Sequence, residues 1–233
     1  MAALSDRVYV VTGGGGAIAR AILRAFAGAG AQVVVVDRTL DHARAAAEEV
    51  GGLALAADLT TAAGADEMIR ATVSARGRVD GLIHTVGGFA MGKVHEVDPA
   101  EYDRMFDLNV RSLFYVTRSL LGELLPRKEG FLAAFASEPA WTGQAPGMSL
   151  YAAAKSAVAT FLRSLDGELA GTQIRVAIAY PMGAVDTPAN RKDMPDFDPA
   201  RYIDPAEIAE TLLFAATRGA RARLLELPVF PQR

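Results

Sequence analysis

The sequence predicts one α/β domain in three layers, a doubly wound parallel sheet of about seven strands with helices on both faces. Apolar segments of strand length alternate along the chain with longer segments of helical period. Most of the short segments are continuously apolar and β-branched, such as the four valines at 33–36, and this composition indicates strands buried on both faces. Such alternation is typical of a parallel sheet covered by helices. No interior linker or repeat interrupts residues 1–233, so we expect a single domain.

Each element follows from its own stretch of sequence. The predicted strands are the apolar runs at 7–12, 32–37, 53–57, 81–86, 130–136, 173–180 and 224–229. The predicted helices lie between them, at about 16–29, 40–50, 60–76, 98–125, 150–170 and 205–218. Two helix starts are explicit, because Asp98 and Asp204 each precede Pro-Ala-Glu, which places Pro and Glu in the first turn. The least regular stretch, 183–203, is expected to be a substrate-binding loop.

Charge and composition exclude several classes of protein. The 24 Lys and Arg residues against 27 Asp and Glu residues give a formal charge of −3, which offers no reason to expect a nucleic-acid or membrane partner. The lack of cysteine excludes disulfides, thiolate metal sites and a cysteine nucleophile, and we expect no metal site. No apolar run approaches the roughly 18 residues that span a bilayer, and residues 1–11 lack a signal-peptide pattern. We therefore expect a soluble, cytoplasmic protein.

A glycine-rich turn follows the first predicted strand, where residues 12–20 read Thr-Gly-Gly-Gly-Gly-Ala-Ile-Ala-Arg and a helix begins. Glycines at this place let the backbone approach a pyrophosphate, which the free N–H groups of the helix can hold. The turn predicts dinucleotide binding in a Rossmann-like fold, with Gly13, Gly15, Gly16 and Ile18 as contacts. The alternative is an ordinary strand-to-helix turn.

The second predicted strand ends at Asp37. A carboxylate there can accept hydrogen bonds from the adenosine ribose hydroxyls and repels a 2′-phosphate, which favours NAD over NADP. NADP stays an alternative cofactor because the guanidinium of Arg38 can accommodate that phosphate. Asp37 could instead only cap the next helix, although Thr39 and Asp41 are better placed for capping.

Tyr151 and Lys155 lie four residues apart at the start of a predicted helix, so their side chains share one face. An unperturbed tyrosine has a pKa near ~10 and is a poor base at neutral pH. A neighbouring ammonium, together with the positive charge of an oxidised nicotinamide, favours the phenolate and lowers that pKa. Taken alone, such a pair is usually packing plus a surface charge.

In this context the sequence resembles the short-chain dehydrogenase/reductase family over essentially its whole length. The family's Tyr-x-x-x-Lys pair matches Tyr151 and Lys155, and its asparagine in the helix after the fourth strand matches Asn109. Its serine after the fifth strand matches Ser137. Its acidic residues after the second and third strands match Asp37 and Asp58.

The resemblance implies an oxidoreductase that passes hydride between a nicotinamide cofactor and a carbonyl or alcohol carbon. Tyr151 would act as general acid or base, and Lys155 would lower its pKa and hold the nicotinamide ribose. Ser137 would hydrogen-bond the substrate oxygen, and Asn109 would interrupt its helix and hold a water in a proton relay.

The resemblance also implies further cofactor contacts. Asp58 would bind the adenine amino group and Leu59 would pack on the adenine ring. Gly87 would allow close approach of the backbone to the cofactor. Pro181 and Thr187, after the sixth strand, would lie at the nicotinamide end.

The chain departs from the family in the glycine turn, where its last two glycines are Ala17 and Ala19. Each methyl group stands where cofactor or strand packs closely, so we expect weaker or shifted pyrophosphate binding. Gly15 and Gly16 partly compensate through loop freedom.

Other departures surround the chemistry. The family's Asn-Asn-Ala-Gly reads His-Thr-Val-Gly at 84–87, and His84, at a strand end, is more often structural than a base. Ser137 precedes Tyr151 by 14 residues, one more than usual, so Thr142 is an alternative hydroxyl donor. Thr187 is one residue later than the family pattern, which leaves nicotinamide placement open.

The expected substrate is a small, mainly apolar ketone or secondary alcohol, since Phe89, Trp141, Met148 and Met182 are predicted to line its pocket. Any one of these could instead be a core or subunit contact. The resemblance implies a homo-oligomer, a tetramer or dimer, formed through helices 98–125 and 150–170. The alternative function is a non-catalytic nucleotide-binding sensor or scaffold; a methyltransferase would not require the Tyr–Lys pair.

Overall fold

The computed structural model describes residues 3–219 and 221–232, and these residues form one parallel sheet of seven strands in the order β3-β2-β1-β4-β5-β6-β7. The strands are β1 (Val8–Thr12), β2 (Gln32–Asp37), β3 (Leu53–Ala56), β4 (Gly81–His84), β5 (Glu129–Phe135), β6 (Gln173–Pro181) and β7 (Glu226–Val229). The predicted doubly wound sheet is confirmed, with each strand inside or close to its predicted run.

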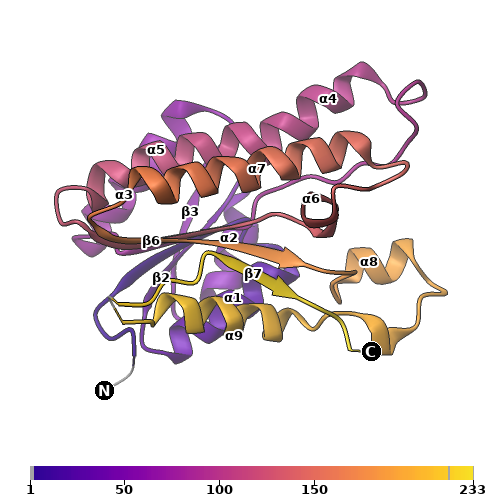
Figure 1. Cartoon of the computed structure of the whole chain (residues 1–233). Helices are drawn as coiled ribbons and strands as arrows, with labels where there is room; N and C mark the ends of the chain where they lie inside the picture. Colours follow the sequence, from indigo (N-terminus) through magenta and orange to yellow (C-terminus); the bar gives the residue numbers. More distant parts are fainter. Residues whose placement is uncertain (1–2, 220, 233) are drawn as a thin grey trace.

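Helices cover both faces of the sheet (Figure 1). The α-helices are α1 (Ala17–Gly28), α2 (Leu40–Glu48), α3 (Ala62–Arg76), α4 (Pro99–Phe106), α5 (Ser112–Leu124), α6 (Glu138–Thr142), α7 (Ser149–Glu168), α8 (Pro188–Asp193) and α9 (Pro205–Ala216). Buried side chains of α1, α2 and α9 form one core cluster and those of α3, α5 and α7 the other. Tyr9 and Val11 of β1 face the first cluster while Val8 and Val10 face the second, as the alternation of a strand requires.

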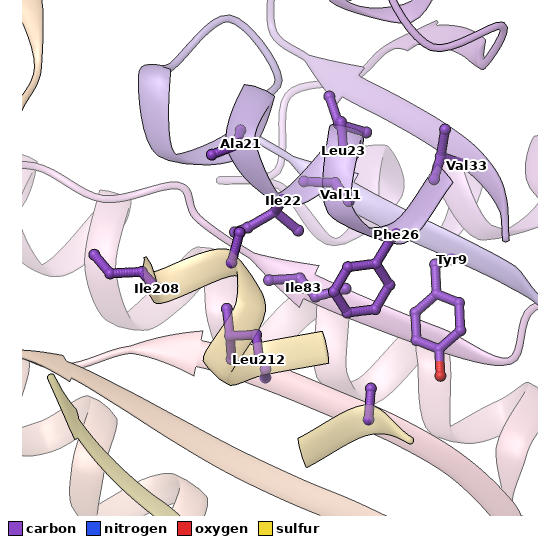
Figure 2. Packing of buried hydrophobic residues seen from close by; sticks show 14 of the residues in the cluster. Tyr9, Val11, Ala21, Ile22, Leu23, Phe26, Val33, Ile83, Ile208 and Leu212 are labelled. Atoms are coloured by element: carbon purple, nitrogen blue, oxygen red, sulfur yellow. The ribbon is translucent and has the colours of Figure 1, made fainter. Parts of the chain in front are cut away.

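The first cluster shows how the last helix closes the domain. Figure 2 shows Ile22 and Phe26 of α1 close to Ile208 and Leu212 of α9. The Phe26 ring also meets the Tyr9 ring of β1 edge-on, with centroids 4.9 Å apart. Aromatic pairs of this geometry favour a fixed arrangement beyond the burial of their area.

The explicit helix starts are confirmed. The Asp98 carboxylate accepts from the Ala100 N–H at 2.8 Å, and the Asp204 carboxylate accepts from the Ala206 N–H at 2.8 Å. Each cap stabilises its helix by about 1 kcal/mol.

One predicted segment is refined and another needs correction. The predicted helix 98–125 is interrupted at Asn109, as the resemblance implies, by a π-helix at Asp107–Arg111, where the Asn109 and Ser112 side chains bond to main-chain carbonyls of the preceding turn. The segment 183–203 is not irregular, since it holds α8 and the 3₁₀ helix η2 (Pro199–Arg201). Thr187 and Asp198 cap these helices, each followed by Pro, and the sequence carried that signal.

Because all strands are parallel, their carboxyl ends meet at one edge of the sheet. Chain order reverses at β1, whose neighbours are β2 and β4, and such a switch point is where open α/β sheets bind ligands. In Figure 1, α4, α6 and α8 gather toward this end, where β6 and β7 point. Among the described helices, none has the length and apolar character needed to cross a membrane.

Candidate active site

A cleft of about 830 Å³ opens at the carboxyl ends of β1, β2 and β4. Most of the predicted cofactor contacts line it: Gly13, Gly15, Gly16, Ile18, Asp37, Arg38, Asp58, Leu59, Gly87 and Thr187. Pro181, Tyr151 and Lys155 are not among its lining residues. Leu108 and Ala189 line it without having been predicted, and neither residue type carries a motif that would have revealed it.

The glycine turn owes its shape to missing side chains. Gly13 has φ +69°, and a Cβ there would lie 2.7 Å from the Thr85 hydroxyl oxygen. Gly15 donates its N–H to the Asp37 carboxylate at 3.0 Å, and a Cβ at Gly15 would lie 3.2 Å from that same oxygen. No side chain caps α1 at Gly16, so its first N–H groups face an anion site without a competing side-chain oxygen.

The two alanines of the turn are buried to different degrees. Both line the cleft: Ala17 is the first residue of α1, and Ala19, which has no exposed surface, also packs into the core cluster beneath the turn. The cleft stays open with both methyl groups present. Weaker pyrophosphate binding stays a prediction.

Backbone N–H groups and a histidine surround the Asp37 carboxylate. Besides Gly15, the Thr39 N–H donates to its carboxylate at 3.2 Å, and His42 Nδ1 lies 3.6 Å away. Thr39 is the N-cap of α2 but makes no side-chain capping bond. Asp37 therefore joins the glycine turn to the start of α2, and His42 is a neighbour that sequence spacing did not indicate.

Asp58 is also held in place. The Thr60 hydroxyl and N–H donate to its carboxylate at 2.6 and 3.0 Å. These bonds, with the hydroxyl first, lower the pKa of Asp58, so it is a carboxylate at neutral pH.

Tyr151 and Lys155 lie near the start of α7 on one face, with Lys155 Nζ 6.0 Å from the Tyr151 ring centroid. Lys155 is 7% exposed and donates to the Phe135 carbonyl at 2.8 Å. Burial lowers the pKa of Lys155 to about 8. Burial raises the pKa of the Tyr151 phenol, and the nearby Ser137 hydroxyl acts in the opposite direction. The protein alone thus keeps the phenol protonated, a difference from the lowered pKa expected with a cofactor's charge.

Ser137 is buried at the N-terminus of α6, and among the described residues its Oγ has no hydrogen bond of good geometry, only the proximity to the Tyr151 phenol that lowers the pKa of Tyr151. A buried hydroxyl without a partner is costly unless a ligand supplies one. The alternative donor, Thr142, already bonds the Glu138 carbonyl at 3.1 Å. Ser137 is therefore the better placed of the two hydroxyls for a substrate oxygen.

Asn109 sits in the π-helix, buried, with both ends of its amide bonded. Nδ2 donates to the Met105 carbonyl at 2.9 Å and the Gly88 carbonyl at 3.1 Å, and Oδ1 accepts from the Gly88 N–H at 3.3 Å. A Cβ at Gly87 would lie 2.7 Å from Asn109 Oδ1 and 3.2 Å from Lys155 Nζ. Gly87 lines the cleft, so it connects the cleft to Asn109 and Lys155.

The predicted substrate side chains do not all meet. Phe89 is 53% exposed and its ring packs edge-on against Tyr151, with centroids 5.0 Å apart. Trp141 packs instead on Tyr180, at 5.0 Å, and Met182 is buried in the core. Met148 is half-buried where α7 begins.

The loops that carry Phe89 and Met148 are tied together. Gly92 N–H donates to the Gly147 carbonyl at 2.7 Å. Arg104 Nη2 donates to the Phe89 carbonyl at 2.8 Å, a contact that the sequence did not suggest. Phe89 therefore stands beside the phenol on a braced loop.

The sequence pattern of the family described as short chain dehydrogenase matches residues 7–197. The chain belongs to this family. Membership of the short-chain dehydrogenase family makes it an oxidoreductase by type and agrees with the Tyr–Lys pair, the glycine turn and the strand order above.

Curated relatives and solved structures span the whole chain. An uncharacterized oxidoreductase of Staphylococcus epidermidis is 28% identical over 237 aligned positions, covering 99% of this chain and 100% of the relative. The 3-ketoacyl-(acyl-carrier-protein) reductase of Brucella melitensis, complexed with NADH, has a TM-score of 0.88 at 29% identity and covers 97% of this chain and 98% of its own. A metagenomic short-chain oxidoreductase in complex with NADP has a TM-score of 0.85 at 26% identity, with 99% of both chains covered.

Proposed function

We propose that this short-chain dehydrogenase interconverts a small, mainly apolar ketone and its secondary alcohol with a nicotinamide cofactor, and that residues 1–233 form one catalytic domain. One observation carries the proposal: the buried Ser137 hydroxyl lies near the Tyr151 phenol, on whose helix face Lys155 also lies. A hydroxyl and a phenol held together in this way can both bond one substrate oxygen.

The cleft suits a dinucleotide. The uncapped start of α1 would hold the pyrophosphate, Asp37 the adenosine ribose, and Asp58 with Leu59 the adenine. Lys155, beside Gly87, would hold the nicotinamide ribose. When bound, the nicotinamide supplies or accepts the hydride. We propose NAD as the preferred form because the Asp37 carboxylate repels a 2′-phosphate; relatives complexed with NADH and with NADP are both known.

The chain's own residues handle the proton. Burial keeps the Tyr151 phenol protonated, so in reduction it donates its proton to the substrate oxygen as the alcohol forms. Ser137 donates a hydrogen bond to the same oxygen, where negative charge develops. The ammonium of Lys155, whose pKa is about 8, favours the tyrosinate left behind and permits its reprotonation. In oxidation the same groups act in reverse.

A carbonyl substrate with an apolar body fits the residues beside the phenol. Phe89 packs against Tyr151 and leaves half of its surface exposed for a substrate. The relatives whose names state a carbonyl substrate, the 3-ketoacyl reductase above and an actinorhodin polyketide ketoreductase with a TM-score of 0.88 at 25% identity, support this class. We also propose a homotetramer, because Tyr102 of α4 and Phe114 of α5 expose large apolar surfaces.

The decisive test compares Tyr151→Phe with Tyr102→Phe, a matched loss of one hydroxyl from an exposed tyrosine. For a ketone substrate found by screening, we expect Tyr151→Phe to lower kcat by about 10³-fold, which is the typical contribution of a general acid to the rate. NADH affinity, followed by nicotinamide fluorescence, should change by less than about twofold. A non-catalytic sensor, favoured by Ala17 and Ala19 in the turn, would bind NADH without turnover in either protein. Unchanged turnover in Tyr151→Phe would contradict the assignment of Tyr151.

A further inference from the structure

His84 joins two parts of the site through the core. It ends β4 and is 2% exposed. Its Nδ1 lies 2.9 Å from the Thr12 hydroxyl oxygen and its Nε2 lies 2.9 Å from the Ser112 hydroxyl oxygen. Thr12 ends β1 directly before the glycine turn, and Ser112 follows the π-helix.

The surrounding groups decide which ring nitrogen carries the proton. The Ser112 hydroxyl lies 2.6 Å from the Leu108 carbonyl, which can only accept, so Ser112 donates its single proton there. Ser112 Oγ must then accept from His84, which places the imidazole proton on Nε2. Nδ1 in turn accepts from the Thr12 hydroxyl, whose oxygen accepts the Thr85 N–H at 3.3 Å. When the imidazole is neutral, each donor in this series of hydrogen bonds, from the Thr12 hydroxyl to the Leu108 carbonyl, has one acceptor.

The electrostatic surroundings favour the same neutral form. Burial, with the nearby Lys155 charge, lowers the pKa of His84 to about 3. A neutral ring at physiological pH cannot act as a cationic acid, and its two nitrogens are already bonded inside the core. His84 therefore does not reach a substrate.

The hydrogen bonds of His84 and those of Asn109 connect the same two segments, the end of β4 and the π-helix. Leu108, at the far end of the series of hydrogen bonds, is the residue before Asn109 in the π-helix. The Asn109 amide bonds both the N–H and the carbonyl of Gly88, and Gly88 follows His84 by four residues along the chain. A π-helical turn holds one more residue than an α-helical turn, so relaxing it would rotate Asn109 by about 100° around the helix axis.

We propose that His84 and Ser112 are positioning residues that clamp the π-helix to the ends of β1 and β4 and so keep Asn109 beside Gly87 and Lys155. The consequence for catalysis rests on the function proposed above, whereas the clamp itself is a property of the fold. Loss of the Ser112 bond frees the π-helix but leaves His84 bonded to Thr12, next to the glycine turn. We therefore expect such a loss to lower turnover without lowering nucleotide affinity.

The first experiment compares Ser112→Ala with Thr117→Val. Thr117 lies on the same helix, is also 2% exposed, and its hydroxyl has no partner in the described part of the chain, so its loss breaks no bond. We expect Ser112→Ala to lower kcat about tenfold or more, to leave NADH affinity within about twofold, and to speed amide exchange across 107–112. Thr117→Val should change none of these. Equal kcat and equal exchange in the two variants would overturn the clamp.

The second variant is His84→Asn. The asparagine side chain can still hydrogen-bond the Thr12 hydroxyl, but it is too short to reach the Ser112 hydroxyl. Combined with Ser112→Ala it should lower kcat no further than Ser112→Ala does alone, because both changes break the same link. Additive losses would show two independent structural effects and overturn the proposal.

The wild-type protein provides a readout that needs no turnover. In a ¹⁵N-histidine NMR titration, the signal absent from His84→Asn should stay neutral with its proton on Nε2 from pH 5 to 8. If wild type binds NADH but reduces no ketone, the proposed function fails while this spectrum and the exchange data still judge the clamp. A His84 that titrates in this range, or carries its proton on Nδ1, overturns the clamp. Where His84→Asn does not fold, the His84 signal is assigned in the wild type through its contacts with Thr12 and Ser112.

Discussion

The two ends of the site differ in how far their polar groups are paired before any ligand binds. At the nucleotide end, the Asp37 carboxylate already accepts N–H bonds from Gly15 and Thr39. At the proposed catalytic end, the buried Ser137 hydroxyl has no hydrogen bond of good geometry among the described residues and lies near the Tyr151 phenol. The comparison teaches that backbone donors already hold the acidic side chain at the first end, whereas the Ser137 hydroxyl at the second can still bond a substrate oxygen.

The comparison also explains where the chain tolerates departures from its family. The turn keeps its shape with Ala17 and Ala19 because the groups that hold it are main-chain N–H donors and a carboxylate. The catalytic end keeps Ser137, Tyr151 and Lys155, since a hydroxyl, a phenol and an ammonium have no backbone substitute.

Among the tests of this comparison, the largest effect is expected at the Ser137 hydroxyl. Ser137→Ala should lower kcat for ketone reduction about 100-fold, as loss of a donor to a developing oxyanion does, without lowering the free energy of unfolding. Thr142→Ala, which removes a hydroxyl already bonded to the Glu138 carbonyl, should leave kcat within about twofold. The measurements are steady-state kinetics and urea unfolding. If Thr142→Ala lowered kcat and Ser137→Ala did not, Thr142 would be the hydroxyl that bonds the substrate oxygen.

The next effect tests the backbone of the nucleotide end. Gly13→Ala should lower the free energy of unfolding by about 2 kcal/mol, because φ +69° is unfavourable for alanine and its Cβ would meet the Thr85 hydroxyl. NADH affinity should fall with it. Gly122→Ala is the control, since a Cβ there meets nothing within 4 Å and alanine favours the helix. Equal stability in both variants would show that the turn is not held by its backbone geometry.

A pH series tests the burial of Lys155. Because burial lowers the folded-state pKa to about 8 from 10.5, the unfolded chain binds more protons between these values. Wild-type stability should therefore rise relative to Lys155→Met by roughly 1.5 kcal/mol between pH 8 and 9.5. The control is Lys192→Met, which removes an ammonium group from the exposed surface of α8. Parallel curves for wild type and Lys155→Met would mean that the ammonium is not desolvated.

The smallest effect tests the charge of Asp37. Asp37→Asn keeps an oxygen that can accept from Gly15 but removes the repulsion of a 2′-phosphate. NADPH affinity should improve relative to NADH by about tenfold, while Asp41→Asn, on the exposed start of α2, should shift neither. An unchanged ratio would make Arg38 the residue that sets the preference.

Much of the fold was predictable because it depends on local pattern. Runs such as the valines of β2 and the Asp-Pro starts of α4 and α9 each carry their own signal. The resemblance implied an interruption at Asn109, but the composition of residues 107–111 is ordinary for a helix, and the π-helical form arises from side chains bonding to the preceding turn. The capped helix α8 was missed because three prolines in 183–203 were interpreted as irregularity.

The sequence by itself determined the layered α/β class, the glycine turn and the shared face of Tyr151 and Lys155, because each depends on residues close together in the chain. Only the tertiary structure decided that His84 bridges Thr12 and Ser112, that the Ser137 hydroxyl is buried near the Tyr151 phenol, and that burial raises the pKa of Tyr151. These properties depend on which side chains meet across the sheet and how much water they lose. Contacts between residues as far apart as 12 and 84 exist only once the strands have paired.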